Sequence, residues 1–207
     1  GDVYKRQVQN PLIVTDAILV KSGTVDLALA QLGGRRYGLF DQVKPEPEIS
    51  IVEDCTRAYR EGGHDGLIAV GGGSAIDIAK GVAAFANHEG PLTELFGVDL
   101  VKRKGPPLIA IPTTAGTGSE VTNVAIFSDN QAQLKKGIVS DYLLPDVALV
   151  SPLMTLTCPR SVTAASGVDA LVHAIEAYLS VNASPITDAI ALGAIKLIVK
   201  ALPKAYA

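Results

Sequence analysis

The sequence contains few cysteine and aromatic residues. Among 207 residues there are two cysteines, one methionine and no tryptophan, and aromatic residues make up 5%. Cys55 and Cys158 lie far apart and form no CxxC pair, so neither a disulfide framework nor a zinc knuckle is encoded. This cysteine usage is typical of a reducing compartment, and we therefore expect a cytoplasmic protein.

The sequence also lacks a charge excess and a long apolar run. Its 18 Lys and Arg residues stand against 21 Asp and Glu residues, for a formal net charge of -3. Such a chain has no basic field for a nucleic acid. No apolar run approaches the roughly 20 residues that a membrane span requires. We expect a small-molecule partner, no nucleic acid and no membrane, and a homo-oligomer stays open.

Hydrophobic residues are plentiful, at 48% against 19% charged residues, which indicates a globular chain with a sizeable core. At roughly 150 residues per domain, the length predicts between one and two domains. Residues 1–7 lack an initiator methionine and a clear period, so we leave them out of the fold prediction.

Apolar strands alternate with helical patterns over the first two thirds of the chain. Such alternation is typical of a parallel sheet buried on both faces. The predicted strands are 12–16, 37–40, 66–70 and 107–111, and the predicted helices are near 25–32, 49–61 and 75–86. Three closer strands follow at 124–128, 137–140 and 147–150, with a turn at Asp129 and Asn130. We interpret them as a hairpin and a last sheet strand.

Strand patterns disappear after Pro152, where 162–179 and 186–202 have helix-length apolar patterns. We therefore predict an α/β domain over residues 1–151 and the start of an all-α domain over residues 152–207. The second helix is apolar on most sides and needs neighbours around it. We expect this helical domain to be cut short.

A run of three glycines, Gly71 to Gly73, followed by Ser74, lies between a buried strand and a helix start. Glycines allow close backbone approach and positive φ, and a helix N-terminus attracts phosphate. We predict a dinucleotide-binding loop, with Ser74 as helix N-cap or phosphate donor. The alternative is a tight turn before a capped helix.

A second polar loop follows the next buried strand, at residues 112–120, and contains four hydroxyl side chains and two glycines. Its place at a strand's carboxyl end favours the ligand crevice of an α/β sheet, although a self-satisfied polar turn is the alternative. Asp16 ends the first strand, where a carboxylate binds a ribose hydroxyl and repels a 2′-phosphate, favouring NAD over NADP. Asp16 is equally well explained as a helix N-cap.

Asp169 and His173 are spaced i, i+4 on the first long helix of the second domain, so both can bind one metal ion. Apolar neighbours place this face in the interior, where a buried Asp–His hydrogen bond is the alternative. The remaining histidines, His64 and His88, belong to the sheet domain, where we expect them to be exposed. Two ligands fall short of the three or four that a catalytic metal site uses.

Three segments together resemble the iron-containing, group III alcohol dehydrogenases. They are GGGSAIDIAK at 71–80, PTTAGTGSE at 112–120 and GVDALVHAIEAY at 167–178. The resemblance implies a dehydroquinate-synthase-like fold, with a Rossmann-like, mostly parallel sheet domain for NAD followed by an all-α domain that holds Fe²⁺ or Zn²⁺.

The resemblance also assigns roles to individual residues. Cofactor contacts fall on Asp16 for the adenosine ribose, on Gly72, Gly73 and Ser74 for the pyrophosphate, and on Thr113, Thr114, Thr117 and Lys135 for other parts of the dinucleotide. Asp169 and His173 match the first two metal ligands. The family's later histidines, one of them close to the substrate, match nothing in this sequence, so the catalytic residue is unknown. Glu46 stands where the family usually has Asn.

The implied activity is hydride transfer between NAD(H) and a small primary alcohol or aldehyde, with the metal acting as Lewis acid. We expect the 207-residue chain alone to be inactive, and one alternative is a module that binds NAD without chemistry. A dehydroquinate-synthase-type lyase is the other alternative. Its phosphorylated substrate would require more basic residues than residues 160–207 provide.

Overall fold

The computed structural model describes residues 8–129 and 133–207. It divides into two compact units. The first, which we call the sheet unit, comprises Gly1–Thr113 and Ser119–Met154. The second, the helical unit, comprises Thr114–Gly118 and Thr155–Ala207, so a short piece of the second polar loop groups with the C-terminal helices.

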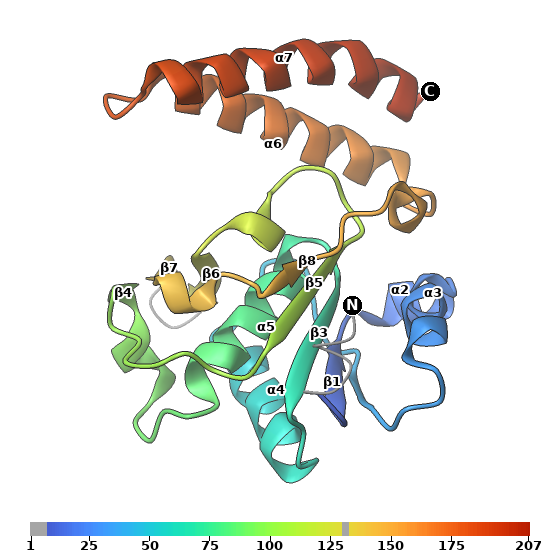
Figure 1. Ribbon diagram of the computed structural model, residues 1–207, viewed down its shortest axis with the longest axis vertical. Helices are drawn as coiled ribbons and strands as arrows, with labels where there is room; N and C mark the ends of the chain where they lie inside the picture. The colour runs from blue at the N-terminus through green and yellow to red at the C-terminus, as the bar shows by residue number, and fades with distance from the viewer. Residues whose placement is uncertain (1–7, 130–132) are drawn as a thin grey trace. The chain divides into compact units, whose positions relative to one another are not determined.

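A five-stranded parallel sheet forms the centre of the sheet unit (Figure 1). Its strands are β1 (Pro11–Val14), β2 (Gly38–Phe40), β3 (Gly66–Gly71), β5 (Leu108–Pro112) and β8 (Val147–Ala148), in the order β2-β1-β3-β5-β8. Every neighbouring pair is parallel. The predicted α/β class is confirmed, and counted along the chain this strand order is 2-1-3-4-5, one of the common doubly wound arrangements.

Successive strand residues face opposite sides of the sheet, and both sides are covered by helices. On one side, Leu12 and Leu67 pack in the cluster formed with α4 (Ile49–Glu61) and α5 (Gly73–Phe85). On the other, Ile13 and Ile68 pack with Val25 of α3 (Thr24–Leu29). Continuous apolar runs therefore form strands buried on both faces, as the sequence predicted.

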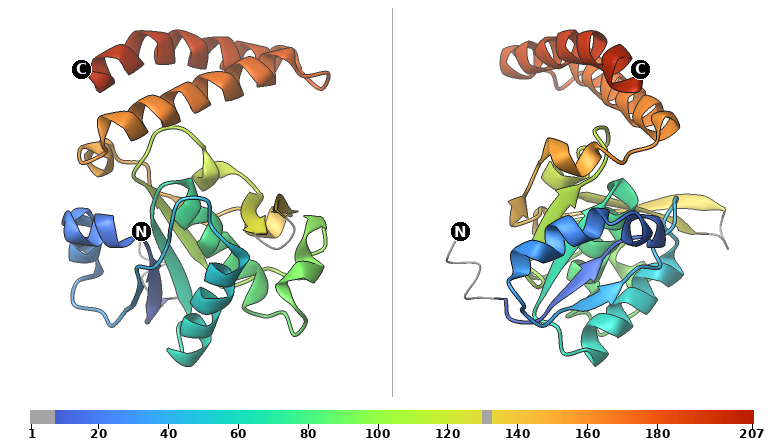
Figure 2. Two further views of the ribbon diagram at one scale, coloured as in Figure 1. Left: turned by 180° about the vertical axis from the view of Figure 1, so that it is seen from behind. Right: turned by 90° about the vertical axis from the view of Figure 1, so that its right-hand side faces the viewer.

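A second, three-stranded sheet has the order β4-β7-β6. Its strands are β4 (Gly97–Val98), β6 (Val124–Asp129) and β7 (Leu134–Val139). The predicted hairpin is confirmed, because β6 and β7 pair antiparallel, and it extends from the sheet unit in Figure 2. Asn130 of the predicted turn lies outside the described residues. Phe127 is fully buried and packs so closely on α5 that a Cβ at Gly81 would lie 2.8 Å from its ring.

The remaining elements of the sheet unit are short. They are the α-helix α2 (Ala17–Lys21) and the 3-10 helices η1 (Ala30–Leu32), η2 (Leu92–Leu95), η3 (Ser119–Val121) and η4 (Asp141–Leu143); η5 (Pro152–Thr155) crosses the boundary between the units. Helix α2 was not predicted, because five residues are too few to show a helical period.

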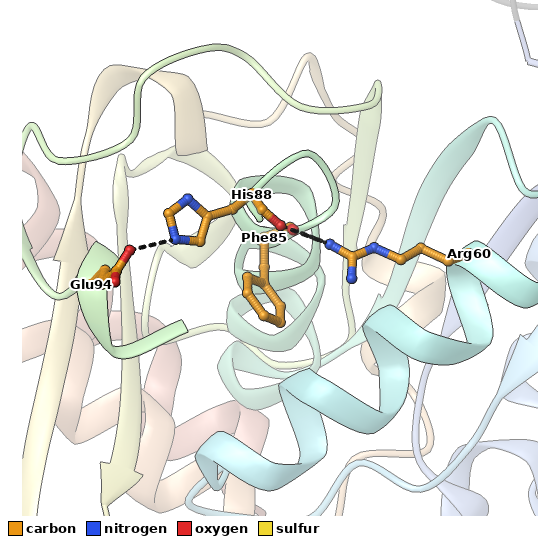
Figure 3. A network of polar contacts seen from close by, with 4 residues as sticks. All are labelled: Arg60, Phe85, His88 and Glu94. Carbon is orange, nitrogen blue, oxygen red and sulfur yellow. Dashed lines mark hydrogen bonds and ion pairs between the residues drawn. The ribbon is translucent and has the colours of Figure 1, made fainter. Parts of the chain in front are cut away.

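Arg60, near the end of α4, caps the C-terminal end of α5. Its guanidinium donates to the carbonyl oxygens of Phe85 at 2.8 Å, Ala86 at 3.2 Å and His88 at 3.1 Å. It also lies over the Phe85 ring, 5.3 Å from the centroid, and His88 contacts Glu94 in turn (Figure 3). A cation at the carbonyl end of a helix satisfies the last acceptors and opposes the helix dipole.

The helical unit contains two long antiparallel helices, α6 (Arg160–Leu179) and α7 (Pro185–Tyr206) (Figure 1). Ser184 and Thr187 form a capping box at the start of α7. Gly167 allows the two helices to approach, since a Cβ there would lie 2.3 Å from a methyl carbon of Leu202. No helix among the described residues is both long and apolar enough to cross a membrane.

Candidate functional site

The carboxyl ends of β1, β3 and β5 lie side by side in the sheet, and each leads into a segment with predicted cofactor contacts. Val14 pairs with Ala69 and Gly71 with Pro112, so the strands end nearly level. The backbone N–H of Thr113 donates to the Gly71 carbonyl at 3.0 Å, which joins the glycine run directly to the second loop. The chain reverses direction across the sheet between β1 and β3, and ligands of doubly wound sheets bind at such switch points.

The glycine run is tightly packed but has no left-handed residue. Gly71, Gly72 and Gly73 all have φ outside the left-handed region, so none of them uses the positive φ that glycine allows. Small size is what the position requires, since a Cβ at Gly71 would lie 2.6 Å from that of Ala75. Helix α5 begins at Gly73 with Gly72 as its N-cap, so the prediction of Ser74 as N-cap is wrong. No side chain caps this end, which leaves first-turn N–H donors for an anion.

Asp16 acts as the N-cap of α2. Its Oδ1 accepts hydrogen bonds from the N–H groups of Ile18 and Leu19, both at 2.9 Å. The N-cap interpretation of Asp16 is therefore confirmed. The cap uses one carboxylate oxygen, and Oδ2 is left for a second contact at the same strand end.

The hydroxyl residues of the second loop are divided between the two units. Thr113 is buried at the end of β5 in the sheet unit, whereas Thr114 and Thr117 group with the helical unit. Gly118 has a φ of 65°, and a Cβ at Gly116 would lie 2.5 Å from the Ser166 carbonyl oxygen. The structure therefore brings Thr113, but not Thr114 or Thr117, into one unit with the glycine run.

Lys135 on β7 forms an ion pair with Glu46 in the loop after β2, with 3.2 Å between Nζ and Oε1. Both side chains are mostly exposed. Glu46 has a φ of 55°, which is uncommon for a residue other than glycine and better tolerated by asparagine. Lys135, which the resemblance assigns to the cofactor, and Glu46, which stands where the family usually has Asn, are thus in direct contact.

The sequence analysis did not identify two charged residues of α5, Asp77 and Lys80, as site residues. Asp77 Oδ2 accepts the N–H of Ile126 at 3.1 Å, and its Oδ1 is buried without a hydrogen-bond partner among the described residues. Burial raises the pKa of Asp77 to about 6, against the opposing effects of the Ile126 N–H, the Lys80 charge and the Ser119 hydroxyl. Lys80 is fully buried. Charges inside the apolar helix pattern of 75–86 were the signal that could have revealed them.

Asp169 and His173 lie on one face of α6, with 3.6 Å between Oδ1 and Nε2. This distance is too long for a hydrogen bond, and the side chains are 44% and 52% exposed, so both the predicted interior position and the buried hydrogen bond are wrong. The buried residues of α6 are instead Gly167, which lies against Leu202 of α7, and Ala174. An ion could still use both side chains, since i, i+4 neighbours share a face.

The other histidines have protein partners. His64 Nδ1 lies 3.0 Å from the Asn10 carbonyl oxygen and His88 Nε2 lies 3.2 Å from Glu94. Both are partly buried, so their expected exposure is wrong. Within residues 8–129 and 133–207, no group of three or more His, Cys, Asp or Glu side chains could hold a metal. Among the described residues, Asp169 and His173 therefore supply only half of the ligands of a metal site.

Comparison with known proteins covers the whole chain. The family described as iron-containing alcohol dehydrogenase matches residues 1–152, and its C-terminal family matches residues 163–207. The long-chain-alcohol dehydrogenase 1 of Geobacillus thermodenitrificans is 45% identical over 212 residues, which is 100% of this chain and 53% of that protein. The 1,3-propanediol dehydrogenase of Klebsiella pneumoniae is 42% identical, over 95% of this chain and 52% of that protein.

A solved structure shows the same arrangement. The sulfoacetaldehyde reductase from Bifidobacterium kashiwanohense, in complex with NAD⁺, has a TM-score of 0.89 and 34% identity, over 99% of this chain and 55% of that one. The chain thus spans about half the length of the relatives it matches. Because both family models match and the fold is similar to that of a solved relative, the chain belongs to the iron-containing alcohol dehydrogenase family.

Proposed function

We propose that this chain carries the NAD site of a metal-dependent alcohol dehydrogenase, which transfers hydride between NAD(H) and a small primary alcohol or aldehyde. The observation that carries the proposal is the meeting of three strand ends, where Thr113 bonds to Gly71 and Asp16 follows the end of the neighbouring strand β1. The names of the alcohol dehydrogenase relatives support the substrate class.

Each part of the site has a separate task in binding. The uncapped first turn of α5, at Gly72, Gly73 and Ser74, receives the pyrophosphate, because its N–H groups and dipole favour negative charge. Asp16 accepts from the adenosine ribose through Oδ2 and disfavours a 2′-phosphate, so the site selects NAD. Lys135 is assigned to the nicotinamide end, and Thr113 supplies a further hydroxyl contact from the sheet unit.

Asp169 and His173 would hold Fe²⁺ or Zn²⁺, since a carboxylate and an imidazole suit both ions. When bound, the ion supplies Lewis-acid stabilisation of charge on the substrate oxygen. Two half-exposed ligands bind an ion weakly, because catalytic sites use three or more protein ligands. We therefore infer that the 207-residue chain binds NAD without turning over.

Two assays of the purified chain test the two parts of the proposal. Calorimetry measures dinucleotide binding, and an NADH-oxidation assay measures turnover. We expect NAD⁺ to bind with a higher affinity than NADP⁺, and no NADH oxidation with acetaldehyde in the presence of Fe²⁺ or Zn²⁺. Absence of NAD⁺ binding would refute the cofactor site. Metal-dependent NADH oxidation would refute the inactivity of the chain alone.

A further inference from the structure

Lys80 is a fully buried lysine in the middle of α5. Its ammonium group donates three hydrogen bonds: to the Thr122 carbonyl oxygen at 2.7 Å, to the Thr122 hydroxyl at 3.0 Å and to the Val124 carbonyl oxygen at 2.8 Å. A lysine ammonium has three donors, so the site uses all of them.

Burying such a charge is costly, and an apolar side chain of the same length would fill the space at a lower cost. Two negative charges reduce the cost, Asp77 one turn earlier on α5 and Glu120 on η3. Filling space does not require three bonds to a single short segment. The arrangement instead indicates that Lys80 holds that segment in place.

The segment held by Lys80 leads into β6 and packs against α5. Lys80 fixes Thr122 and Val124, and one turn nearer the helix start Asp77 accepts from Ile126 of the same strand. Helix α5 is thus fastened to β6 at two points. The first turn of this helix, Gly73 and Ser74, begins only a few residues before Asp77.

We propose that Lys80 is a positioning residue for the dinucleotide site, which fixes the first turn of α5 and the Asp77 carboxylate relative to residues 119–124. This inference rests on the proposed NAD binding. Lys80 itself is buried under the segment that it holds and contacts no ligand. Its effect on the cofactor passes through the position of the helix.

The pH dependence of NAD⁺ affinity distinguishes a positioning role of Lys80 from a purely structural one, because only the positioning role makes this affinity depend on the protonation of Lys80. Burial lowers the pKa of Lys80 to about 8, while the charges of Asp77 and Glu120 oppose the shift. Loss of the proton removes one of three donors. NAD⁺ affinity of the wild-type chain should therefore weaken severalfold between about pH 7 and pH 9.

The test is calorimetric titration of NAD⁺ into the full 207-residue chain and its Lys80→Met variant. Met is unbranched and only one atom shorter than Lys, and it removes every donor. We expect the dissociation constant to rise about tenfold at pH 7 and to lose its dependence on pH, since charge-assisted bonds of this kind are lost. Val25→Ala, buried on the opposite face of the sheet, is the control that lowers stability without raising this constant.

A milder variant keeps the inference testable if Lys80→Met does not fold. Thr122→Val removes only the hydroxyl acceptor, and we expect the dissociation constant to rise about two- to threefold. Unchanged binding in Lys80→Met, or unchanged binding in Thr122→Val with a flat wild-type pH profile, would overturn the role of Lys80 while the NAD site stands. A wild-type chain that does not bind NAD⁺ at all would overturn the proposed function and this inference together.

Discussion

Lys135 and Glu46 form an ion pair across 89 residues of sequence, with 3.2 Å between Nζ and Oε1. The pair joins β7 to the loop that follows β2, and both side chains are more than half exposed. An exposed pair of this kind contributes about 0–1 kcal/mol to folding. In the proposed cofactor site, the pair places a carboxylate beside the lysine assigned to the nicotinamide end.

Replacing Glu46 with asparagine should strengthen dinucleotide binding. The variant removes a negative charge from a site that receives an anion, and it releases Lys135. Asparagine also tolerates the φ of 55°, so we expect unchanged or slightly higher thermal stability. Calorimetry should show NAD⁺ binding about two- to threefold tighter. Weaker binding would mean that Glu46 contacts the cofactor directly.

Asp16 is a helix cap and the proposed ribose ligand, and substitutions can separate the two roles. Asp16→Asn keeps an oxygen for the N–H groups of Ile18 and Leu19, whereas Asp16→Ala removes it. We expect Asp16→Ala to lower the free energy of unfolding by about 1 kcal/mol and Asp16→Asn to leave it nearly unchanged.

In both Asp16 variants, the affinity for NADP⁺ relative to that for NAD⁺ should be higher than in the wild-type chain. Both substitutions remove the charge that repels a 2′-phosphate. Urea unfolding and paired titrations with the two dinucleotides provide the measurements. An unchanged preference for NAD⁺ in both variants would leave Asp16 as a cap alone.

Arg60 should stabilise the fold without affecting the cofactor. Arg60→Ala leaves the carbonyl groups of Phe85, Ala86 and His88 without their cation, and we expect a loss of about 1–2 kcal/mol in the free energy of unfolding. Arg57→Ala is the matched control, since Arg57 pairs with Asp54 on the helix surface and with no other acidic side chain of the described residues. NAD⁺ affinity should be the same in both, because the phosphate end of α5 is the opposite one; a specific loss in Arg60→Ala would contradict this.

Lys80 should make stability rise with pH in the alkaline range. Its pKa is about 8 in the folded chain and 10.5 for the ordinary side chain, so between these values the unfolded chain binds more protons. The contribution is therefore fully present above the ordinary value and lost as pH falls through about 8. Urea midpoints of the wild-type chain should rise relative to those of Lys80→Met from pH 8 upward. Parallel curves would show that Lys80 titrates normally.

Local patterns allowed most of the fold to be predicted from the sequence. Helix α4 has the predicted bounds, and β3, β5 and the β6–β7 hairpin differ from prediction by a few residues. Apolar runs and turn residues specify such elements through neighbours close in the chain. Helix α2 depends instead on one capping contact by Asp16, which a periodicity analysis cannot detect.

The site was less predictable because its contacts are distant in sequence. Asp77 and Lys80 bond to residues that lie between 42 and 49 positions later in the chain. The pairing of Glu46 with Lys135 likewise joins separate elements. The prediction that Asp169 and His173 face the interior was wrong for a related reason. Apolar periodicity predicts which helix face can be buried, but it does not predict what covers that face.

The most direct test of the account is amide chemical-shift mapping of NAD⁺ on the isotope-labelled 207-residue chain. The proposed site predicts perturbation concentrated at Asp16, at Gly72, Gly73 and Ser74, and at Thr113, with little change at Arg60 on the far end of α5. Saturable binding whose shifts fall elsewhere, or no shift at these residues at saturating NAD⁺, would contradict the placement of the dinucleotide at the ends of β1, β3 and β5.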